Sequence, residues 1–292
     1  MTAPGPLAPT AADLAGRVGL DEQPLGVPVP LPALRDPLPT VRLDHTHFSV
    51  LVRPDRRLAA VAGVGIDGAL LRDLSRAGID WRLDPRLPAD QQTGEDVYAS
   101  NDLDRGHLVR RADAVWGATE IEAQQGNEDT FSLTNAAPQA AAFNQGEELW
   151  LGLEDLLLGN AATGQRRLVV FTGPVLAPTD PPYRGVQVPL RFWKVAAFVD
   201  GGELGATGYV LDQTDLVGDL TQRATDSPPP PGAFRTFQVP IADIAALTGL
   251  DMDRLVAVDR LPAVADQPVG GPGVPTGSVP LTTPAQVRWQ RP

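Results

Sequence analysis

Two segments of alternating and β-branched residues predict strands early in the chain. They run from His47 to Val52 and from Leu58 to Val64, with a turn at Pro54-Asp55 between them. Further along, the short apolar runs Arg167 to Thr172 and Arg191 to Val199 are typical of buried strands. The pattern therefore predicts a sheet that contains these four segments.

Helical periodicity is longest between Gln139 and Leu158, where leucines recur at spacings of three and four residues. A shorter helix is predicted from Ile241 to Leu247, after the strand-like segment Phe237 to Pro240 and before Thr248-Gly249. The segment Gly94 to Arg111 shows neither period. We therefore expect a loop there.

Both ends of the chain are rich in proline and lack periodicity. Residues 1–40 are rich in alanine and proline, and residues 257–292 in proline and glycine, which favours extended, solvated chain. We expect an N-terminal extension that is ordered only in part, a domain at residues 41–256 and a C-terminal tail. No secretory signal is visible near the N-terminus and no apolar run predicts a membrane-spanning helix. A cytoplasmic location and export by a route without such a signal both stay open.

Composition narrows the chemistry that the chain can perform. It contains no cysteine, which excludes disulfides, thiolate zinc sites and cysteine nucleophiles, so a metal ion must bind oxygen or imidazole ligands. The formal net charge of −12 speaks against a broad surface for nucleic acid. The segment Asp104 to Arg111, however, carries three arginines and one acid. A local basic site is therefore compatible with an acidic chain.

A glycine pattern at Gly63, Gly65 and Gly68 matches the dinucleotide-binding fingerprint and follows a predicted strand. Residues Ala69 to Ala77 could form the helix that this fingerprint needs. Past Asp80, however, the chain is polar and broken by prolines where a second strand and crossover would be required. We interpret the glycines as a tight turn and disfavour a dinucleotide-dependent enzyme.

The run Asp104-Arg105-Gly106-His107 is the strongest candidate for chemistry. The chain has three histidines, His45, His47 and His107, and only His107 lies beside the basic cluster. Imidazole titrates near neutral pH and can take a proton from water, as phosphodiester hydrolysis requires. On an extended strand Arg105 would share the face of His107, and its guanidinium could bind the phosphate. The alternative is an ordinary turn with a hydrogen-bonded histidine.

Further blocks surround this run in a fixed order along the chain. They are His47 to Val50, Ile66 to Gly68, Trp81, Asp84 to Arg86, Phe131 to Asn135, Pro138-Gln139, Phe143 to Gln145, Trp150 to Asp155, Phe171 to Val175, Phe192 to Val195, Gln238 to Ile241 and Leu247 to Leu250. In this order the chain resembles the non-specific DNA/RNA endonucleases of the ββα-metal fold, a family that includes secreted bacterial nucleases and endonuclease G. The resemblance covers about residues 43–256. It implies an α+β fold with a central, mostly antiparallel sheet and a ββα-metal nuclease motif on one side.

The resemblance also implies a role for each matching residue. His107 matches the general base that activates water, and Arg105 matches the arginine that stabilises the transition state. Asn144 matches the protein ligand of a mostly hydrated Mg²⁺ ion, with Mn²⁺ as the second candidate metal. Asp104 and Asn135 match supporting positions. The implied function is hydrolysis of DNA and RNA with little sequence preference, which leaves 5′-phosphate ends.

Glu154 matches the glutamate that orients metal-bound water, but its spacing departs from the family. Ten residues separate it from Asn144, where the family has about eight, and at about 100° per residue the two spacings place the carboxylate on opposite sides of the asparagine. An insertion within Gly146 to Leu149, or a bulge in the helix, would explain the difference. Glu147 or Glu148 is the alternative for this role.

Three basic residues, Arg110, Arg111 and Lys194, are the predicted contacts to the phosphates of DNA and RNA. Such contacts make binding sensitive to salt and nearly independent of sequence. His45 and His47 share a strand face, but two ligands are too few for a metal site, so we expect packing or placement at the surface. A homodimer follows from the resemblance, and an inhibitor protein is a further candidate partner. The alternative function is a weakly active or inactive nuclease-like module that binds nucleic acid or acts as an effector.

Overall fold

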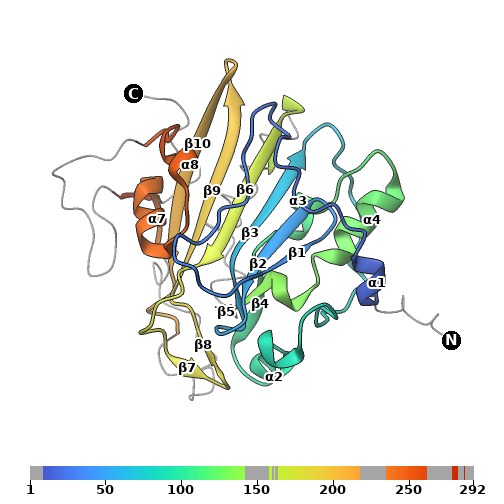
Figure 1. The fold of residues 1–292 in the computed structure, drawn as a ribbon, viewed down its shortest axis with the longest axis vertical. Coiled ribbons are helices and arrows are strands. Elements are labelled where there is room, and N and C mark those ends of the chain that lie inside the picture. The colour runs from blue at the N-terminus through green and yellow to red at the C-terminus, as the bar shows by residue number, and fades with distance from the viewer. Residues whose placement is uncertain are drawn as a thin grey trace.

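A large antiparallel sheet forms the centre of the computed structural model (Figure 1). The structure describes residues 9–141, 158–159, 161, 164–217, 235–261, 278–281 and 286. Within these residues the sheet has eight strands in the order β1-β2-β3-β6-β9-β10-β11-β12. They are β1 (Val41–Asp44), β2 (Phe48–Arg53), β3 (Leu58–Asp67), β6 (Arg167–Pro174), β9 (Arg191–Asp200), β10 (Glu203–Asp212), β11 (Arg235–Val239) and β12 (Val279–Leu281). The predicted α+β class with an antiparallel sheet is confirmed.

The four strands predicted from the sequence correspond to β2, β3, β6 and β9. The strand-like segment after residue 236 is also confirmed as β11, and it leads directly into the predicted helix. The pattern does not predict β10, because Gly205 and Gly208 break its apolar run. A one-residue shift of register between Leu51 and Val52 marks a bulge between β2 and β3.

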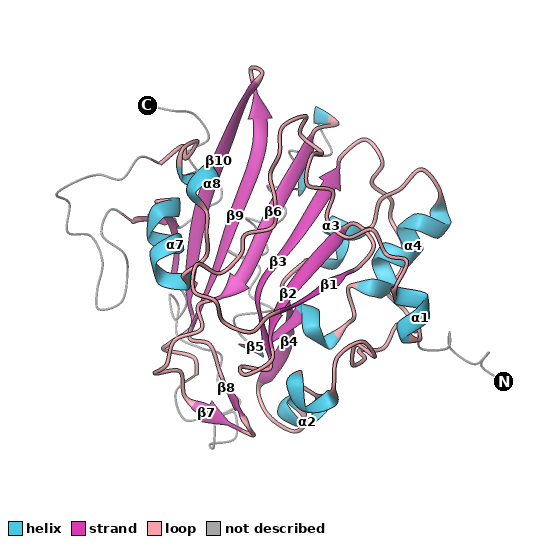
Figure 2. Cartoon of the chain, in the orientation of Figure 1, coloured by secondary structure: helices cyan, strands magenta, loops and turns pink. Residues whose placement is uncertain are grey.

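Both faces of this sheet are covered, which explains why its strands are nearly continuous apolar runs. Successive side chains of a strand alternate. Along β6, Leu168 and Val170 therefore face one core, here called the first core, and Val169 and Phe171 face the second core. The first core lies toward β4 and β5, and the second core lies under α7 and α8 (Figure 2).

The described helices are short. They are α1 (Ala11–Leu14), α2 (Glu95–Tyr98), α3 (Arg111–Ala114), α4 (Glu120–Asp129), α7 (Ile241–Thr248) and α8 (Asp253–Val256), with 3₁₀ turns at Ala89–Gln91 and Leu133–Asn135. The predicted helix after residue 240 is confirmed as α7. No helix among the described residues has the length and apolar character needed to cross a membrane.

The N-terminal segment differs from the partly ordered extension that its composition predicts. Residues 9–40 contain little regular structure, yet Leu20 and Val29 are buried in the second core. A backbone bridge joins Leu34 to Leu250. Proline-rich chain packs here as an extended segment, because a residue without an N–H leaves no donor unsatisfied. The domain boundaries at residues 41 and 256 stay predictions.

Two smaller antiparallel pairs complete the described strands. One joins β4 (Leu103–His107) to β5 (Ala136–Ala140), and the other joins β7 (Pro182–Tyr183) to β8 (Val186–Gln187). The loop predicted for residues 94–111 is therefore wrong, since this segment contains α2 and β4. Charged residues in the middle of β4 hide its strand period from the sequence pattern.

The helix predicted from Gln139 to Leu158 begins too early. Gln139 and Ala140 belong to β5, while most of the remaining segment, residues 142–157, lies outside the described part of the chain.

The disfavoured dinucleotide fold is also excluded by the sheet. The tight turn expected at the glycines is wrong for Gly63 and Gly65, which lie inside β3, and β3 pairs antiparallel with both of its neighbours. Residues 69–77 form no helix. A dinucleotide fold needs a parallel strand–helix–strand unit at this position.

Candidate active site

The pair β4–β5 carries the candidate run Asp104 to His107. His107 is the last residue of β4 and is paired with Ala136. A Cβ on Gly106 would lie 2.0 Å from Oε1 of Gln139, a buried side chain, so this position accepts glycine without displacing its neighbour. Strand packing as well as chemistry therefore restricts the residues of this run.

Asn135 holds the chain directly after His107. Its buried side chain accepts a hydrogen bond from the amide of Val109 at 2.9 Å and donates to the carbonyls of Val109 and Thr130, each at 3.0 Å. Its own carbonyl accepts from the amide of Leu108 at 2.9 Å. These bonds fix the backbone that follows β4, which is a supporting position of the kind that the resemblance implies.

The imidazole of His107 packs against two aromatic rings, which also contact each other. The centroid of Trp81 is 4.5 Å away, and the ring of Phe131 stands edge-on at 5.2 Å. Its Nε2 is buried and has no hydrogen-bond partner among the described residues. Burial, reinforced by the charges of Arg76 and Arg111, lowers the pKa of His107 to about 3. The ring is therefore neutral at physiological pH, with one ring nitrogen unprotonated.

Two of the guanidinium groups near this histidine belong to Arg76 and Arg111. Arg111 donates to the carbonyl of Leu74 at 2.8 Å, and Cζ of Arg76 lies 5.6 Å from the centroid of the Phe131 ring. Burial and then the charge of Arg76 lower the pKa of Arg111. Arg76 is not predictable from the sequence pattern, since it lies in an irregular segment that no motif or period marks.

Arg105 lies two residues before His107 on β4, but its side chain meets a different set of partners. It forms an ion pair with Glu95 of α2, with Nε 2.8 Å from Oε1, and it lies over the ring of Tyr98 at 5.3 Å. The hydrogen bond to Glu95 raises the pKa of Arg105, so the guanidinium stays charged. Among the described contacts, those of Arg105 and His107 have no residue in common.

The remaining predicted contacts divide between the site and the core. Asp104, the first residue of the candidate run, and Arg110, which follows the run, are half-buried, and Asp104 lies opposite Gln139 in the strand register. Lys194, by contrast, is 1% exposed in β9, where its neighbours across the strands are Thr172 and Tyr209. The phosphate contact predicted for Lys194 is therefore corrected, because this lysine lies inside the first core and not at a surface.

The predicted metal ligand Asn144 and the carboxylates Glu147, Glu148 and Glu154 lie outside the described residues. The described residues around His107 contribute cationic guanidinium groups. No group of three histidine, cysteine, aspartate or glutamate side chains in the described part of the chain could hold a metal ion. The metal ligand Asn144 stays a prediction.

The other two histidines pack as expected. His45 is buried and stacks on Phe48 with ring centroids 4.6 Å apart. Burial lowers the pKa of His45 to about 4. His47 stacks on Trp116 at 3.5 Å, away from the catalytic run. Neither is part of a metal-binding group among the described residues.

Comparisons with known proteins show what this chain is similar to. The chain is 38% identical over 267 residues to the protein y4fB of Sinorhizobium fredii, a match that covers 84% of this chain and 40% of that protein. It is 28% identical to mitochondrial endonuclease G of Bos taurus, covering 61% of this chain and 57% of that protein. Nuclease C1 of Cunninghamella echinulata var. echinulata is 29% identical, with 64% of this chain and 68% of that protein covered. The chain thus spans about half the length of the first two relatives.

The fold has a solved counterpart as well. The crystal structure of EndoG in complex with EndoGI matches with a TM-score of 0.56 and 18% identity, over 73% of this chain and 86% of that chain. It supports the ββα-metal nuclease fold. The family model described as DNA/RNA non-specific endonuclease matches residues 34–259, which include every described residue of the candidate site. The chain belongs to the DNA/RNA non-specific endonuclease family.

Proposed function

We propose that this chain is a metal-dependent endonuclease that hydrolyses phosphodiester bonds of DNA and RNA with little sequence preference. The observation that carries the proposal is a neutral imidazole with an unpartnered Nε2, set among guanidinium groups at the end of β4. A base of this kind can remove a proton from water, and the cations can hold the phosphate under attack.

Each described residue has a task in this mechanism. His107 accepts the proton of the attacking water at its ring nitrogen. Arg76 and Arg111 bind the phosphate and compensate the charge that develops on it, while Arg105, held by Glu95, contributes a further cation beside the run. Trp81 and Phe131 exclude bulk water from the ring. The product would carry a 5′-phosphate end.

Members of this family are metal-dependent nucleases, and we propose Mg²⁺ as the metal, with Mn²⁺ as its substitute. Asn144 would be the protein ligand, with Glu154 or one of Glu147 and Glu148 orienting the water around the ion. When bound, the ion supplies a Lewis acid that polarises the phosphate. An inhibitor protein is a proposed partner, because a solved relative, EndoG, is inhibited in its complex with EndoGI.

Cleavage of supercoiled plasmid and of RNA, with Mg²⁺ and with chelator, tests the proposal. The wild-type chain should degrade both substrates only with the metal, and His107→Ala should lose at least about a hundredfold in rate, as expected for a lost general base. Undiminished cleavage by His107→Ala would refute the mechanism. Binding without cleavage by the wild type would favour the nuclease-like binding module instead.

A second comparison tests the metal ligands. Asn144→Ala should abolish the Mg²⁺-dependent rate, and Glu154→Gln, Glu147→Gln and Glu148→Gln are compared with it at several metal concentrations. The variant that needs the highest Mg²⁺ concentration identifies the carboxylate. Equal metal dependence of wild type and Asn144→Ala would remove Asn144 from the site.

A further inference from the structure

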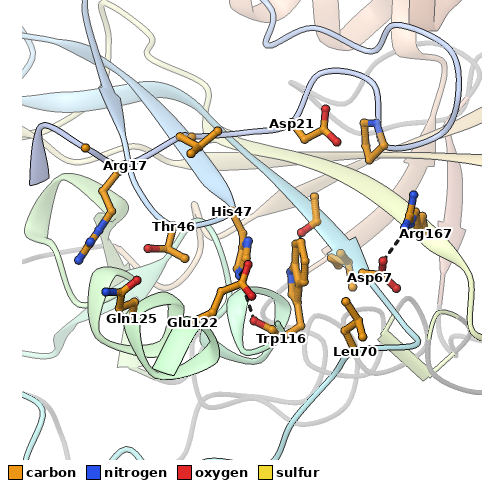
Figure 3. Close-up of a pocket in the computed structure, with 16 residues that line it drawn as sticks. Arg17, Asp21, Thr46, His47, Asp67, Leu70, Trp116, Glu122, Gln125 and Arg167 are labelled. Atoms are coloured by element: carbon orange, nitrogen blue, oxygen red, sulfur yellow. Dashed lines mark hydrogen bonds and ion pairs between the residues drawn. The ribbon is translucent and has the colours of Figure 1, made fainter. Parts of the chain in front are cut away.

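A cavity of about 460 Å³ lies away from the candidate active site (Figure 3). Its walls come largely from the N-terminal segment at residues 16–24, the two residues before β2, the end of β3 and the first turns of α4. It has no residue in common with the described contacts of His107 and Arg105. The volume falls in the range of small-ligand sites.

Two stacked rings, His47 and Trp116, line the central part of this cavity (Figure 3). Their centroids are 3.5 Å apart, and Nε2 of His47 lies 3.0 Å from the carbonyl oxygen of Trp116. The indole N–H donates to the carbonyl of Gly65 at 2.9 Å. His47 has a φ of 72°, a left-handed backbone that costs an L-residue about 1 kcal/mol. The ring pair is therefore a fixed wall that the surrounding structure maintains.

The basic groups of the cavity are already neutralised. Arg17 forms an ion pair with the buried Asp129 at 2.8 Å, and Arg167 pairs with Asp67 at 2.9 Å (Figure 3). Burial lowers the pKa of His47, which keeps its ring neutral.

Two carboxylates of the cavity have no such compensation. One oxygen of Glu122 accepts from the amide of Ala118 at 2.9 Å, and the other lies 4.0 Å from the neutral His47. Asp21 accepts only the backbone amide of Gln23 among the described contacts. The charge that remains open in the cavity is therefore negative.

The geometry points to a binding site for an organic cation, namely a guanidinium or ammonium group carried on an aliphatic stem. The aromatic wall attracts a cation, and Glu122 offers it a charge-assisted hydrogen bond. Leu70 and Val18, 37% and 86% exposed, can pack against the stem. A phosphate would meet uncompensated carboxylates here, so the site is distinct in chemistry from the proposed nuclease centre.

Such a group has two sources, a basic side chain of a partner protein or a free polyamine. Calorimetric titrations of the chain in the absence of nucleic acid distinguish the two sources. N-acetyl-arginine amide represents the basic side chain and spermidine represents the polyamine, and the one that matches the site should bind more tightly. N-acetyl-citrulline amide has nearly the same shape without the charge and should bind at least about tenfold more weakly. His107→Ala should bind the cations as the wild type does, so the test does not depend on the proposed nuclease activity.

Two variants locate the site. Glu122→Gln should weaken binding about tenfold, because the amide still accepts from Ala118 but the charge is lost. The matched control is Glu120→Gln, on the exposed first turn of α4, with unchanged affinity. A Cβ at Gly65 would meet only Leu20, at 3.9 Å, so there is room for a side chain to begin at this position, and Gly65→Leu should narrow the cavity and weaken binding.

Three results would overturn the proposal. The first is the absence of saturable binding by either cation, and the second is equal binding of the citrulline amide. The third is saturable binding of guanosine, an uncharged nucleoside whose base could stack on the rings, in place of the cations. If Glu122→Gln and Gly65→Leu both bind the cations as tightly as the wild type and show native circular dichroism, the cations bind at another place on the chain, and this site is refuted.

Discussion

The environment of His107 predicts the pH below which the nuclease activity falls. Burial and two nearby guanidinium groups hold the pKa of this histidine at about 3, whereas a solvated histidine titrates at about 6.5. The neutral form is the base, so activity should persist as the pH falls until it approaches the folded-state pKa. The expected acid limb of kcat/KM lies below pH 5.

The magnitude follows from the fraction of neutral imidazole. With a pKa of about 3, roughly 99% of His107 is neutral at pH 5, and the base-limited rate should equal the rate at pH 7.5. With a pKa of about 6.5, only about 3% would be neutral at pH 5, and the rate would fall about thirtyfold. Arg76→Gln or Arg111→Gln removes a repelling charge and should move the acid limb to higher pH.

Initial rates of plasmid cleavage at constant ionic strength measure this limb, and NMR titration of the three histidines assigns it. The native fold must be checked at each pH. His45 has a folded-state pKa of about 4, below its unfolded value, so the stability that it contributes is present above about pH 6.5 and is lost as the pH falls toward 4. A thirtyfold loss of rate at pH 5 in a folded chain, with His107 titrating near 6.5, would refute the argument.

Three further substitutions probe the frame of the site. Gly106→Ala must displace the buried side chain of Gln139 and should destabilise the fold by about 1–3 kcal/mol in urea titrations; an unchanged midpoint would contradict the packing argument. Asn135→Ala removes three buried hydrogen bonds and should lower the free energy of unfolding by about 3 kcal/mol or more, measured as a lowered Tm. A decrease in Tm of less than about 2 °C would show that these hydrogen bonds do not hold the chain after β4. Glu95→Gln breaks an exposed ion pair, so stability should change by less than about 1 kcal/mol while kcat falls as Arg105 loses its orientation; equal kcat in both proteins would deny Glu95 this role.

The sequence predicts the large sheet well because both of its faces are covered. Strands such as β6 and β9 are then nearly continuous apolar runs, which a periodicity argument detects. The periodicity does not predict β4, because Asp104 and Arg105 lie in its centre and its strand structure depends on pairing with β5. Its catalytic run was found through motif order, which is a different kind of information.

Tertiary contacts explain what the sequence does not predict at the site. Arg76 reaches Phe131 from a segment without any period, so its proximity to His107 depends on the folding of the intervening chain. Lys194 shows the opposite case. In the sequence it is a cation beside an aromatic residue, and only the sheet register reveals that the first core encloses it.

Local pairing of charges reconciles an acidic chain with a site for polyanions. Several arginines elsewhere are matched with carboxylates, as in the pairs of Arg56 with Asp180 and Arg86 with Asp84. Arg111 instead donates its described hydrogen bonds to the carbonyl oxygen of Leu74 and to an amide oxygen, neither of which carries a charge. The nearby Asp73 compensates the charge of Arg111 only in part, and a setting with little water strengthens what remains. Net charge describes the field far from the protein, whereas a phosphate at the proposed site would meet the local charges of Arg76 and Arg111.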